Sequence, residues 1–204
     1  MSFKVLVIGS GKGSNAQALL HAEQVGKLGA AEIIAVLSDR ADAPILGLAK
    51  GFYKPAQSIP CNPKKARLST EESKQLLEAI RMHAPDLVVL AGFMKILDAP
   101  FIDALGGHII NLHPSLLPSF PGIQSIEQAY NFPVKITGCT VHWVIPKLDA
   151  GPIIDQRAVV IESSDTLSSL TEKVHAAEHV LLPDVVRRIS HNEISLPSEK
   201  SFNE

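Results

Sequence analysis

Three polar side chains that could share one chemical task lie at the ends of two apolar stretches. Asn111 and His113 close the run IINLH, and Asp149 lies in the turn at residues 148–152. Successive side chains of a strand alternate between faces, so Asn111 and His113 should point the same way. Pro114 cannot continue a ladder of strand hydrogen bonds, so the chain should leave the sheet directly after His113. The imidazole is therefore expected at the carboxyl end of a strand, where ligands bind in open α/β sheets.

These residue types suit acyl transfer without a protein nucleophile. An amide and an imidazole aimed together can hold a carbonyl oxygen while it becomes an oxyanion. A neighbouring carboxylate favours the protonated form of the imidazole. Ser115 is an alternative nucleophile, but it lacks the GxSxG context and is expected to be a turn residue. A metal site is a second alternative, which would join His113 to His108, His142 and Asp155. Their spacing matches no known zinc pattern, so we predict no metal.

A glycine-rich loop, GSGKGSN at residues 9–15, lies between the first apolar run and a helical pattern. Glycines let the backbone approach a ligand, and free N–H groups at a helix start favour an anion. A Walker loop is excluded because the lysine is followed by glycine. A dinucleotide fingerprint fits poorly because the third glycine comes one residue early, although Asp39 could still act as the ribose-binding acid of NAD. A plain structural turn is a further alternative. We expect a monophosphate cradle formed by Gly13, Ser14 and Asn15.

Apolar runs alternate with helical patterns over the first 110 residues. Strands are expected at residues 4–8, 32–37, 52–56, 86–91 and 107–113, with edge or antiparallel strands at 134–144 and 152–161. Helices are expected to open near residue 16, to run from Asp42 to about Lys50, from Ser69 or Thr70 to about Met82, and onward from Asp165 or Thr166. Runs that are wholly apolar are typical of strands buried on both faces. We predict an α/β fold: a Rossmann-like open, mostly parallel twisted sheet with helices on both faces.

The length, composition, net charge and cysteine content narrow the class of protein. The 204 residues, 46% of them hydrophobic, suit one α/β domain over 1–204, with residues 191–204 as a loosely held polar tail. The formal net charge of -2 gives no electrostatic case for a nucleic-acid or membrane partner. Two cysteines without CxxC spacing favour reduced thiols in a cytoplasmic protein. The first twenty residues do not resemble a signal peptide. Either a monomer or a homodimer would fit.

Several separated motifs carry a family resemblance. They occupy residues 111–118, Gly122, residues 137–142 and residues 148–154, and they occur in this order. Together they resemble the folate-dependent formyltransferases, over nearly the whole chain from about residue 4 to about residue 190. The loop at residues 11–15 narrows the similarity to the branch that formylates glycinamide ribonucleotide in purine biosynthesis.

The resemblance implies a reaction and a set of catalytic residues. 10-Formyltetrahydrofolate would be the co-substrate, and the amine of 5'-phosphoribosylglycinamide would attack its formyl carbon directly, without a metal. Asn111 and protonated His113 would stabilise the oxyanion. Asp149 would orient and charge His113.

The resemblance also implies how small-molecule substrates are held. The ribonucleotide phosphate would lie on Gly13, Ser14 and Asn15, and Glu178 would contact its ribose or phosphate end. The folate would contact the backbone of Met94, Lys95, Ile96 and Leu97, and also Asn111. On pattern alone, residues 93–97 indicate the start of a helix. The family usually has arginine at position 95, so Lys95 departs from it. Arg67 is the candidate for the carboxylate-bearing tail of the folate.

Three rival functions are weighed against this interpretation. Methionyl-tRNA formyltransferase would need a second, basic domain, for which the chain is expected to be too short and insufficiently basic. Formyltetrahydrofolate deformylase would carry a regulatory domain ahead of the first strand, whereas here that strand is expected to start by Lys4. A nucleotide-binding module without catalysis would not need Asn111, His113 and Asp149 together.

Overall fold

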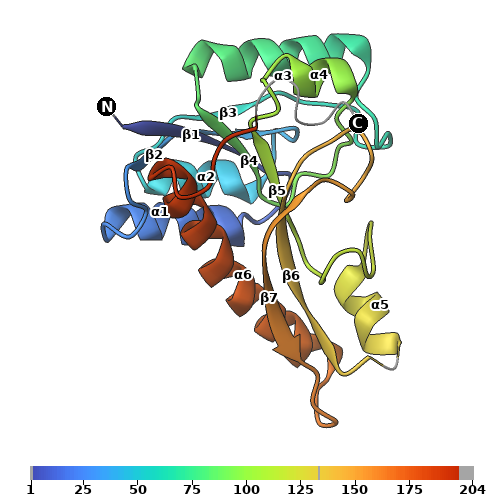
Figure 1. The fold of residues 1–204 in the computed structure, drawn as a ribbon. Helices are drawn as coiled ribbons and strands as arrows, with labels where there is room; N and C mark the ends of the chain where they lie inside the picture. The colour runs from blue at the N-terminus through green and yellow to red at the C-terminus, as the bar shows by residue number, and fades with distance from the viewer. Residues whose placement is uncertain (1, 133, 198–204) are drawn as a thin grey trace.

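One sheet organises the chain, and helices cover both of its faces. The structure is a computed structural model that describes residues 2–132 and 134–197. Its elements are β1 (Phe3–Ile8), α1 (Ser14–Gln24), β2 (Ala31–Ser38), α2 (Pro44–Gly51), β3 (Ala56–Ser58), α3 (Thr70–His83), β4 (Leu87–Leu90), α4 (Ala99–Asp103), β5 (Ile109–His113), α5 (Ser125–Asn131), β6 (Ile136–Trp143), β7 (Ile153–Val160) and α6 (Leu167–Ser190). Within the described residues, the sheet has seven strands in the order β3-β2-β1-β4-β5-β6-β7 (Figure 1). Strands β1 to β5 pair in parallel, and β6 and β7 add antiparallel. The predicted mostly parallel sheet is confirmed.

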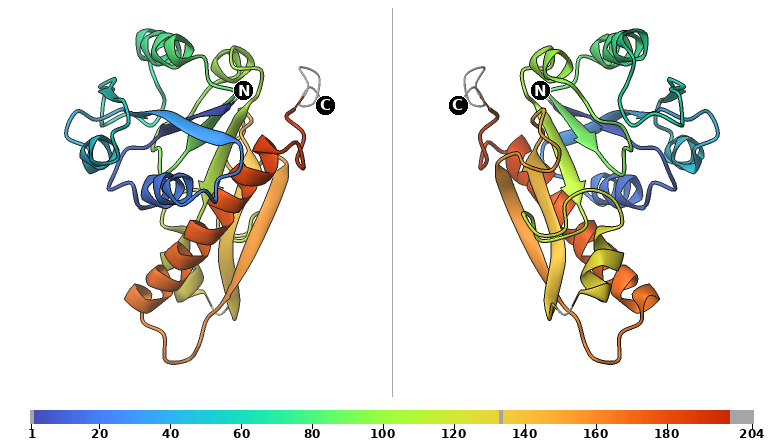
Figure 2. Two further views of the ribbon diagram at one scale, coloured as in Figure 1. Left: turned by 90° about the vertical axis from the view of Figure 1, so that its left-hand side faces the viewer. Right: turned by 90° about the vertical axis from the view of Figure 1, so that its right-hand side faces the viewer.

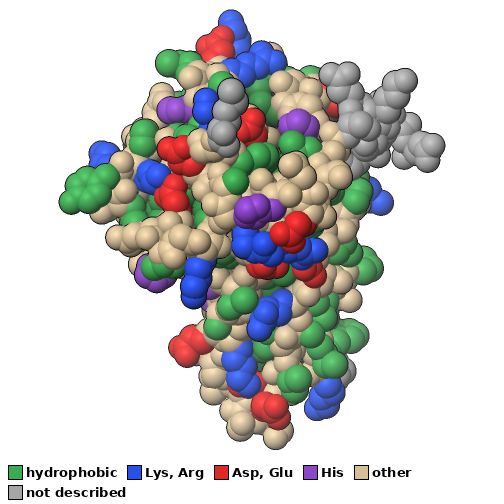
Figure 3. Space-filling view, turned by 60° about the vertical axis from the view of Figure 1, so that its left-hand side comes forward, with side chains coloured by type: hydrophobic (Ala, Val, Ile, Leu, Met, Phe, Trp, Pro, Cys, Tyr) green, Lys and Arg blue, Asp and Glu red, His purple; other side chains and the backbone are tan. Residues whose placement is uncertain are grey.

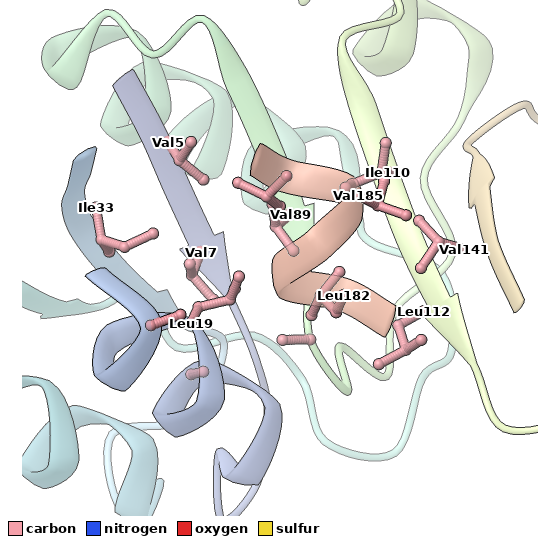
Figure 4. Packing of buried hydrophobic residues seen from close by; sticks show 14 of the residues in the cluster. Val5, Val7, Leu19, Ile33, Val89, Ile110, Leu112, Val141, Leu182 and Val185 are labelled. Atoms are coloured by element: carbon pink, nitrogen blue, oxygen red, sulfur yellow. The ribbon is translucent and has the colours of Figure 1, made fainter. Parts of the chain in front are cut away.

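Two hydrophobic cores lie on opposite faces of the sheet. Val5 and Val7 of β1 belong to the core with α1, α2 and α6, whereas the alternate side chains of β1 belong to the core with α3 and α4. Figure 2 shows α6 lying along one face and α3 on the other. In the first core, Leu182 and Val185 of α6 face the strand residue Ile110 (Figure 4). Each fully buried aliphatic side chain contributes about 1.5–3 kcal/mol. Burial on both faces explains why these strands are mostly apolar.

The topology opens a crevice at one edge of the parallel strands. β1 pairs with β2 on one side and with β4 on the other, so the strand order reverses there. The connections that follow β1 and β4 therefore leave in opposite directions, and a crevice opens outside their carboxyl ends. The glycine-rich loop follows β1, the segment at residues 91–98 follows β4, and His113 ends β5 beside them. The fold thus brings together the segments that the sequence marked for chemistry.

Two of the predicted helix starts have full capping boxes. Ser69 caps α3 by accepting from the backbone of Glu72, whose carboxylate accepts in return from the Ser69 backbone. Thr166 and Ser169 make the same reciprocal pair at the start of α6. A cap of this kind is worth about 1 kcal/mol. Helix α6 continues through Pro183 to its end at Ser190.

Three local predictions were wrong. Asp42 does not cap α2, because its carboxylate pairs with Arg40 at 3.0 Å; the helix begins instead at Pro44, whose fixed φ suits a first turn. The third strand is not at residues 52–56 but at Ala56–Ser58, after a turn in which Tyr53 has a φ of 58°. Residues 93–97 do not start a helix, because Ile96 pairs in parallel with Arg67.

The C-terminal half holds a further helix and the start of the tail. α5 (Ser125–Asn131) was not anticipated from the sequence. Of the expected loose tail at 191–204, Ile194 and Leu196 pack against the core of α1, α2 and α6, and residues 198–204 lie outside the described residues. No described helix is long and apolar enough to cross a membrane. On the face drawn in Figure 3, basic side chains lie interspersed with acidic ones, so this face has no continuous basic patch.

Candidate active site

A cavity of about 610 Å³ opens where the carboxyl ends of β1, β4 and β5 meet. Its wall is formed by residues 11–15, Ala66, residues 90–97, residues 111–114, residues 122–125, several residues of the 142–149 segment, His175 and Glu178. This volume is in the range of small-molecule sites. Every site residue predicted from the sequence lines the cavity except Arg67, which is exposed outside it.

His113 is held at both ring nitrogens. Its Nε2 lies 2.9 Å from the Phe120 carbonyl oxygen and 3.1 Å from Ser125 Oγ. Its Nδ1 lies 3.5 Å from Asp149 Oδ2. The side chain is almost fully buried, because the chain turns back over it after Pro114. The predicted proximity of His113 and Asp149 is therefore present in the fold.

Asp149 comes from the turn between β6 and β7. Its backbone is left-handed, with a φ of 49°, and its Oδ2 accepts the backbone N–H of Gly122 at 2.7 Å. At Gly151, two residues later, any Cβ would collide with the Trp143 carbonyl. Glycine there lets the turn lie against the end of β6 and brings the carboxylate to His113.

Asn111 is oriented by a second histidine. In the β5–β6 pairing, Asn111 lies opposite His142, and its Nδ2 donates to His142 Nε2 at 3.2 Å. The other ring nitrogen of His142 donates to the Trp143 carbonyl at 2.9 Å. Burial lowers the pKa of His142, more than the nearby Asp149 raises it, so the ring is neutral and Nε2 is an acceptor. The second N–H of Asn111 remains for an oxyanion.

The glycine-rich loop enters α1 through a left-handed residue. Gly13 is the N-cap with a φ of 82°, and it provides no side-chain cap for the helix. A Cβ at Gly13 would meet Ile45 at 2.6 Å, so a side chain would displace either the loop or α2. Ser14 and Asn15 open the helix, where backbone N–H groups point outward. This geometry suits an anion such as a phosphate.

Glu178 reaches the same loop from α6. Its Oε2 accepts from Asn15 Nδ2 at 3.0 Å, and the residue is 3% exposed. Burial raises the pKa of Glu178, whereas the hydrogen bond from Asn15 and the nearby His175 and His113 oppose that rise. Asn15 Oδ1 is buried and has no hydrogen-bond partner among the described residues. A buried acceptor of this kind calls for a donor from a ligand or water.

The segment after β4 offers its backbone to the cavity. Residues 94–97 line it, but the Lys95 side chain turns away. Its Nζ donates to the carbonyl of Asn62 at 2.6 Å and to that of Lys65 at 2.8 Å, and it lies 3.9 Å from Asp39. Lys95 thus fastens the loop that carries Arg67 to the end of β4. The Arg67 contact with a folate tail stays a prediction.

Three alternatives lose support from the geometry. Asp39 is buried with Lys95 and does not line the cavity, as a ribose-binding acid of NAD would. Ser115 is fully buried and donates to the Ser119 carbonyl, so it is not an exposed nucleophile. Among the described residues, no three His, Cys, Asp or Glu side chains gather in a way that could hold a metal. Asp155 instead pairs with Arg188 at 2.6 Å.

Two functional contacts were missed by reasoning from the sequence. His142 was noted within a family motif and as an alternative metal ligand, but not as a partner of Asn111. Its partnership with Asn111 required the register of β5 against β6. Ser125 and the Phe120 carbonyl had no sequence signal, because they reach His113 through an irregular loop.

Comparison with known proteins defines the class. A model of the formyl transferase family matches residues 3–186, and the chain therefore belongs to that family. The phosphoribosylglycinamide formyltransferase of Bacillus subtilis (strain 168) is 36% identical over 186 residues, which cover 91% of this chain and 94% of that protein. A crystal structure of phosphoribosylglycinamide formyltransferase from Anaplasma phagocytophilum has a TM-score of 0.87 and 42% identity, covering 97% of this chain and 91% of that one.

A longer relative contains the same segment. The human trifunctional purine biosynthetic protein adenosine-3 is 38% identical over 193 residues, which cover 95% of this chain and 19% of that protein. The resemblance inferred from the motifs, including the branch suggested by the glycine-rich loop, is confirmed.

Proposed function

We propose that this chain transfers the formyl group of 10-formyltetrahydrofolate to the amine of 5'-phosphoribosylglycinamide, a step of purine biosynthesis. One observation carries the proposal: Asn111, His113 and Asp149 converge on a cavity that has a phosphate-type loop at one side and an apolar segment at another. Formyl transfer is the chemistry of the family. The choice of acceptor rests on the named relatives and on the loop.

The two substrates occupy different ends of the cavity. The phosphate lies on Gly13, Ser14 and Asn15, and Glu178 meets the ribose end beside Asn15. The pterin ring of the folate lies along the backbone of residues 94–97, opposite the loop that follows His113. The amine and the formyl carbon then meet next to Asn111 and His113.

The reaction is a direct acyl transfer. The amine nitrogen attacks the formyl carbon, a C–N bond forms, and the carbonyl electron pair moves onto oxygen. Asn111 and protonated His113 donate to that oxyanion. The bond from the formyl carbon to the folate nitrogen then breaks, and this nitrogen takes a proton from His113, directly or through a water. The former amine loses a proton to the now neutral ring, directly or through a water, which restores protonated His113. A preorganised donor to an oxyanion is worth roughly 2.7–4 kcal/mol.

An acceptor assay tests the proposal. Purified protein is supplied with 10-formyltetrahydrofolate and, in separate reactions, with glycinamide ribonucleotide, methionyl-tRNA or water alone. Formylated ribonucleotide is expected. His113→Ala should slow its formation about a thousandfold, whereas the control variant His21→Ala, on the exposed side of α1, should not slow it. Transfer to methionyl-tRNA, or hydrolysis alone, would assign the chain to another function of the family. Binding of NAD without transfer would refute the proposal.

We also propose the setting in which this activity operates. Small molecules are the substrates of a single domain, because every residue invoked here lies in one sheet or in the loops and helices that connect its strands or pack on it. Cys61 and Cys139 are both free and buried, as expected in the reducing cytoplasm. Monomer and homodimer remain alternatives that size-exclusion chromatography with light scattering would separate.

A further inference from the structure

The partners of the two ring nitrogens of His113 differ in kind. On the Nε2 side lie the Phe120 carbonyl oxygen at 2.9 Å and Ser125 Oγ at 3.1 Å. On the Nδ1 side lies the Asp149 carboxylate at 3.5 Å. Asp149 on the Nδ1 side and Ser125 on the Nε2 side both line the cavity, whereas Phe120 does not line it.

The Nε2 partners can both be acceptors. A carbonyl oxygen has no hydrogen to donate, so the 2.9 Å contact with Phe120 requires a hydrogen on Nε2. The hydroxyl of Ser125 lies 3.0 Å from the Gly122 carbonyl, to which it donates. Its single hydrogen is then used, and Oγ offers only a lone pair to His113. If Nε2 carried no hydrogen, its lone pair would face the lone pairs of the Phe120 carbonyl oxygen and of Ser125 Oγ.

From this arrangement we infer that Ser125 and the Phe120 carbonyl keep a permanent proton on Nε2 of His113, so that Nδ1, beside Asp149, carries the proton that moves during formyl transfer. Ser125 is a positioning residue in this account, since it acts through His113. The proton placement follows from contacts alone. Its role in catalysis rests on the proposed function.

The loop that supplies these acceptors is held independently of the substrates. Thr140 Oγ1 donates to the Ser115 carbonyl at 2.7 Å and accepts from the backbone of Leu117. Gln156 donates to Thr140 Oγ1 at 2.8 Å. Ser125 is the first residue of α5 and is 1% exposed. The acceptors therefore occupy fixed positions before any ligand binds.

This arrangement has a mechanistic consequence. A neutral imidazole usually exchanges between two tautomers, and its ring can turn over. With Nε2 bound to acceptors, both the charged and the neutral ring keep the same orientation, and only the Nδ1 proton comes and goes. The charged ring carries a hydrogen on Nδ1, within reach of an oxyanion in the cavity as well as of Asp149, and the neutral ring has a lone pair there. No ring rotation is needed between the two proton transfers of a turnover.

Nitrogen NMR of the histidine rings tests the placement directly. The chain contains eight histidines, and loss of one set of signals in His113→Gln would assign His113 in protein labelled with ¹⁵N-histidine. Two-bond ¹H–¹⁵N spectra distinguish a protonated ring nitrogen from an unprotonated one. At a pH where the ring is neutral, we expect a protonated Nε2 and an unprotonated Nδ1 in the wild type. The opposite tautomer, or an even mixture, would overturn the inference.

Variants of Ser125 test the positioning role. Ser125→Ala removes one acceptor, so the second tautomer should become detectable and kcat should fall about tenfold, the effect of one hydrogen bond, while both KM values change little. Ser125→Thr retains the hydroxyl and should restore both the spectrum and the rate. Ser119→Ala, an exposed change in the same loop, should alter neither.

The two hypotheses fail in different ways. If Ser125→Ala lowers kcat but leaves the tautomer unchanged, or if threonine does not rescue it, Ser125 does not act through the proton on His113. If the wild type shows the expected tautomer but does not formylate the ribonucleotide, the proposed function is wrong and the proton placement stands.

Discussion

Asp149→Asn isolates the charge of the carboxylate from its shape. Asparagine tolerates the left-handed backbone at this position, where φ is 49°, better than most residues. Its side-chain oxygen can still accept the N–H of Gly122, now 2.7 Å from Asp149 Oδ2. The same oxygen position faces Nδ1 of His113, and the amide NH₂ group would take the place of Oδ1, on the side of His142. The variant should therefore fold normally but lack the negative charge that supports a protonated His113.

The magnitude follows from the distance between the two charges. At 3.5 Å, a unit-charge pair with an effective dielectric constant of about 20 interacts by about 5 kcal/mol. Most of that interaction supports the imidazolium that stabilises the oxyanion. Since about 1.4 kcal/mol corresponds to a factor of ten, kcat should fall about a thousandfold. The KM for both substrates should change little, because neither substrate binds through this charge.

The assay is steady-state formyl transfer over a pH series, with circular dichroism as the check on folding. Asp103→Asn, the same change at an exposed carboxylate in α4, is the matched control and should leave kcat intact. His113→Ala should lose a similar factor, and the double variant should be little worse than either single variant, because the pair acts as a unit. Multiplicative losses would mean that Asp149 acts on the substrate amine or a water. Full activity in Asp149→Asn would refute the assigned role.

Three further outcomes are expected from the same structure. Gly13→Ala should lower the unfolding free energy by about 2–4 kcal/mol, because alanine is strained in the left-handed region and its Cβ would approach Ile45 to 2.6 Å. It should also raise the KM for the ribonucleotide more than the KM for folate. Denaturant unfolding and steady-state kinetics check both effects, and an equal rise in both KM values would contradict the prediction. Burial raises the pKa of Glu178, so its ionised form is disfavoured in the folded state, and the stability of the substrate-free protein should decline as the pH rises through that pKa. Glu178→Gln should flatten this dependence in thermal unfolding from pH 4 to 8 and weaken ribonucleotide binding; an unchanged slope would argue against it. Burial raises the pKa of Cys61 to about 11 and that of Cys139 to about 12, so neither thiol should react with iodoacetamide at pH 8 until the protein unfolds; rapid labelling of the native protein would show that the burial is incomplete.

The parts of the fold that followed from the sequence are those where packing leaves a pattern. β4 and residues Val5 to Ile8 of β1 are buried on both faces, so no polar residue interrupts these runs. The capping box of Ser69 and Glu72 marks α3 because its hydrogen bonds are local. α5 has no such mark: Gln124 precedes it with a φ of 59°, and no side chain caps it. Only the path of the preceding loop determines where that helix starts.

The candidate active site also contains some residues that the sequence could place and others that it could not. Asn111 and His113 could be placed because alternation and the following proline act within one strand. The partners that orient them could not be placed, because each comes from a distant segment through pairing or loop closure. Asn111 contacts His142 through the antiparallel register of β5 and β6. His113 contacts the backbone carbonyl of Phe120, and since every residue has such a carbonyl, the sequence does not mark this one. Sequence thus identifies the reacting groups more readily than the groups that hold them.

The distribution of charge among the buried groups explains why a single ion pair can dominate this site. Asp149 has two histidines within reach, His113 at 3.5 Å and His142 at 3.9 Å. Burial lowers the pKa of His142, and the Trp143 carbonyl and Asn111 use its two nitrogens in the neutral form. His142 therefore does not compete for the carboxylate, and the interaction with Asp149 is left to His113. One histidine aims the amide and the other carries the charge, so the oxyanion meets a neutral donor and a charged donor from Asn111 and His113, two residues apart on one face of β5.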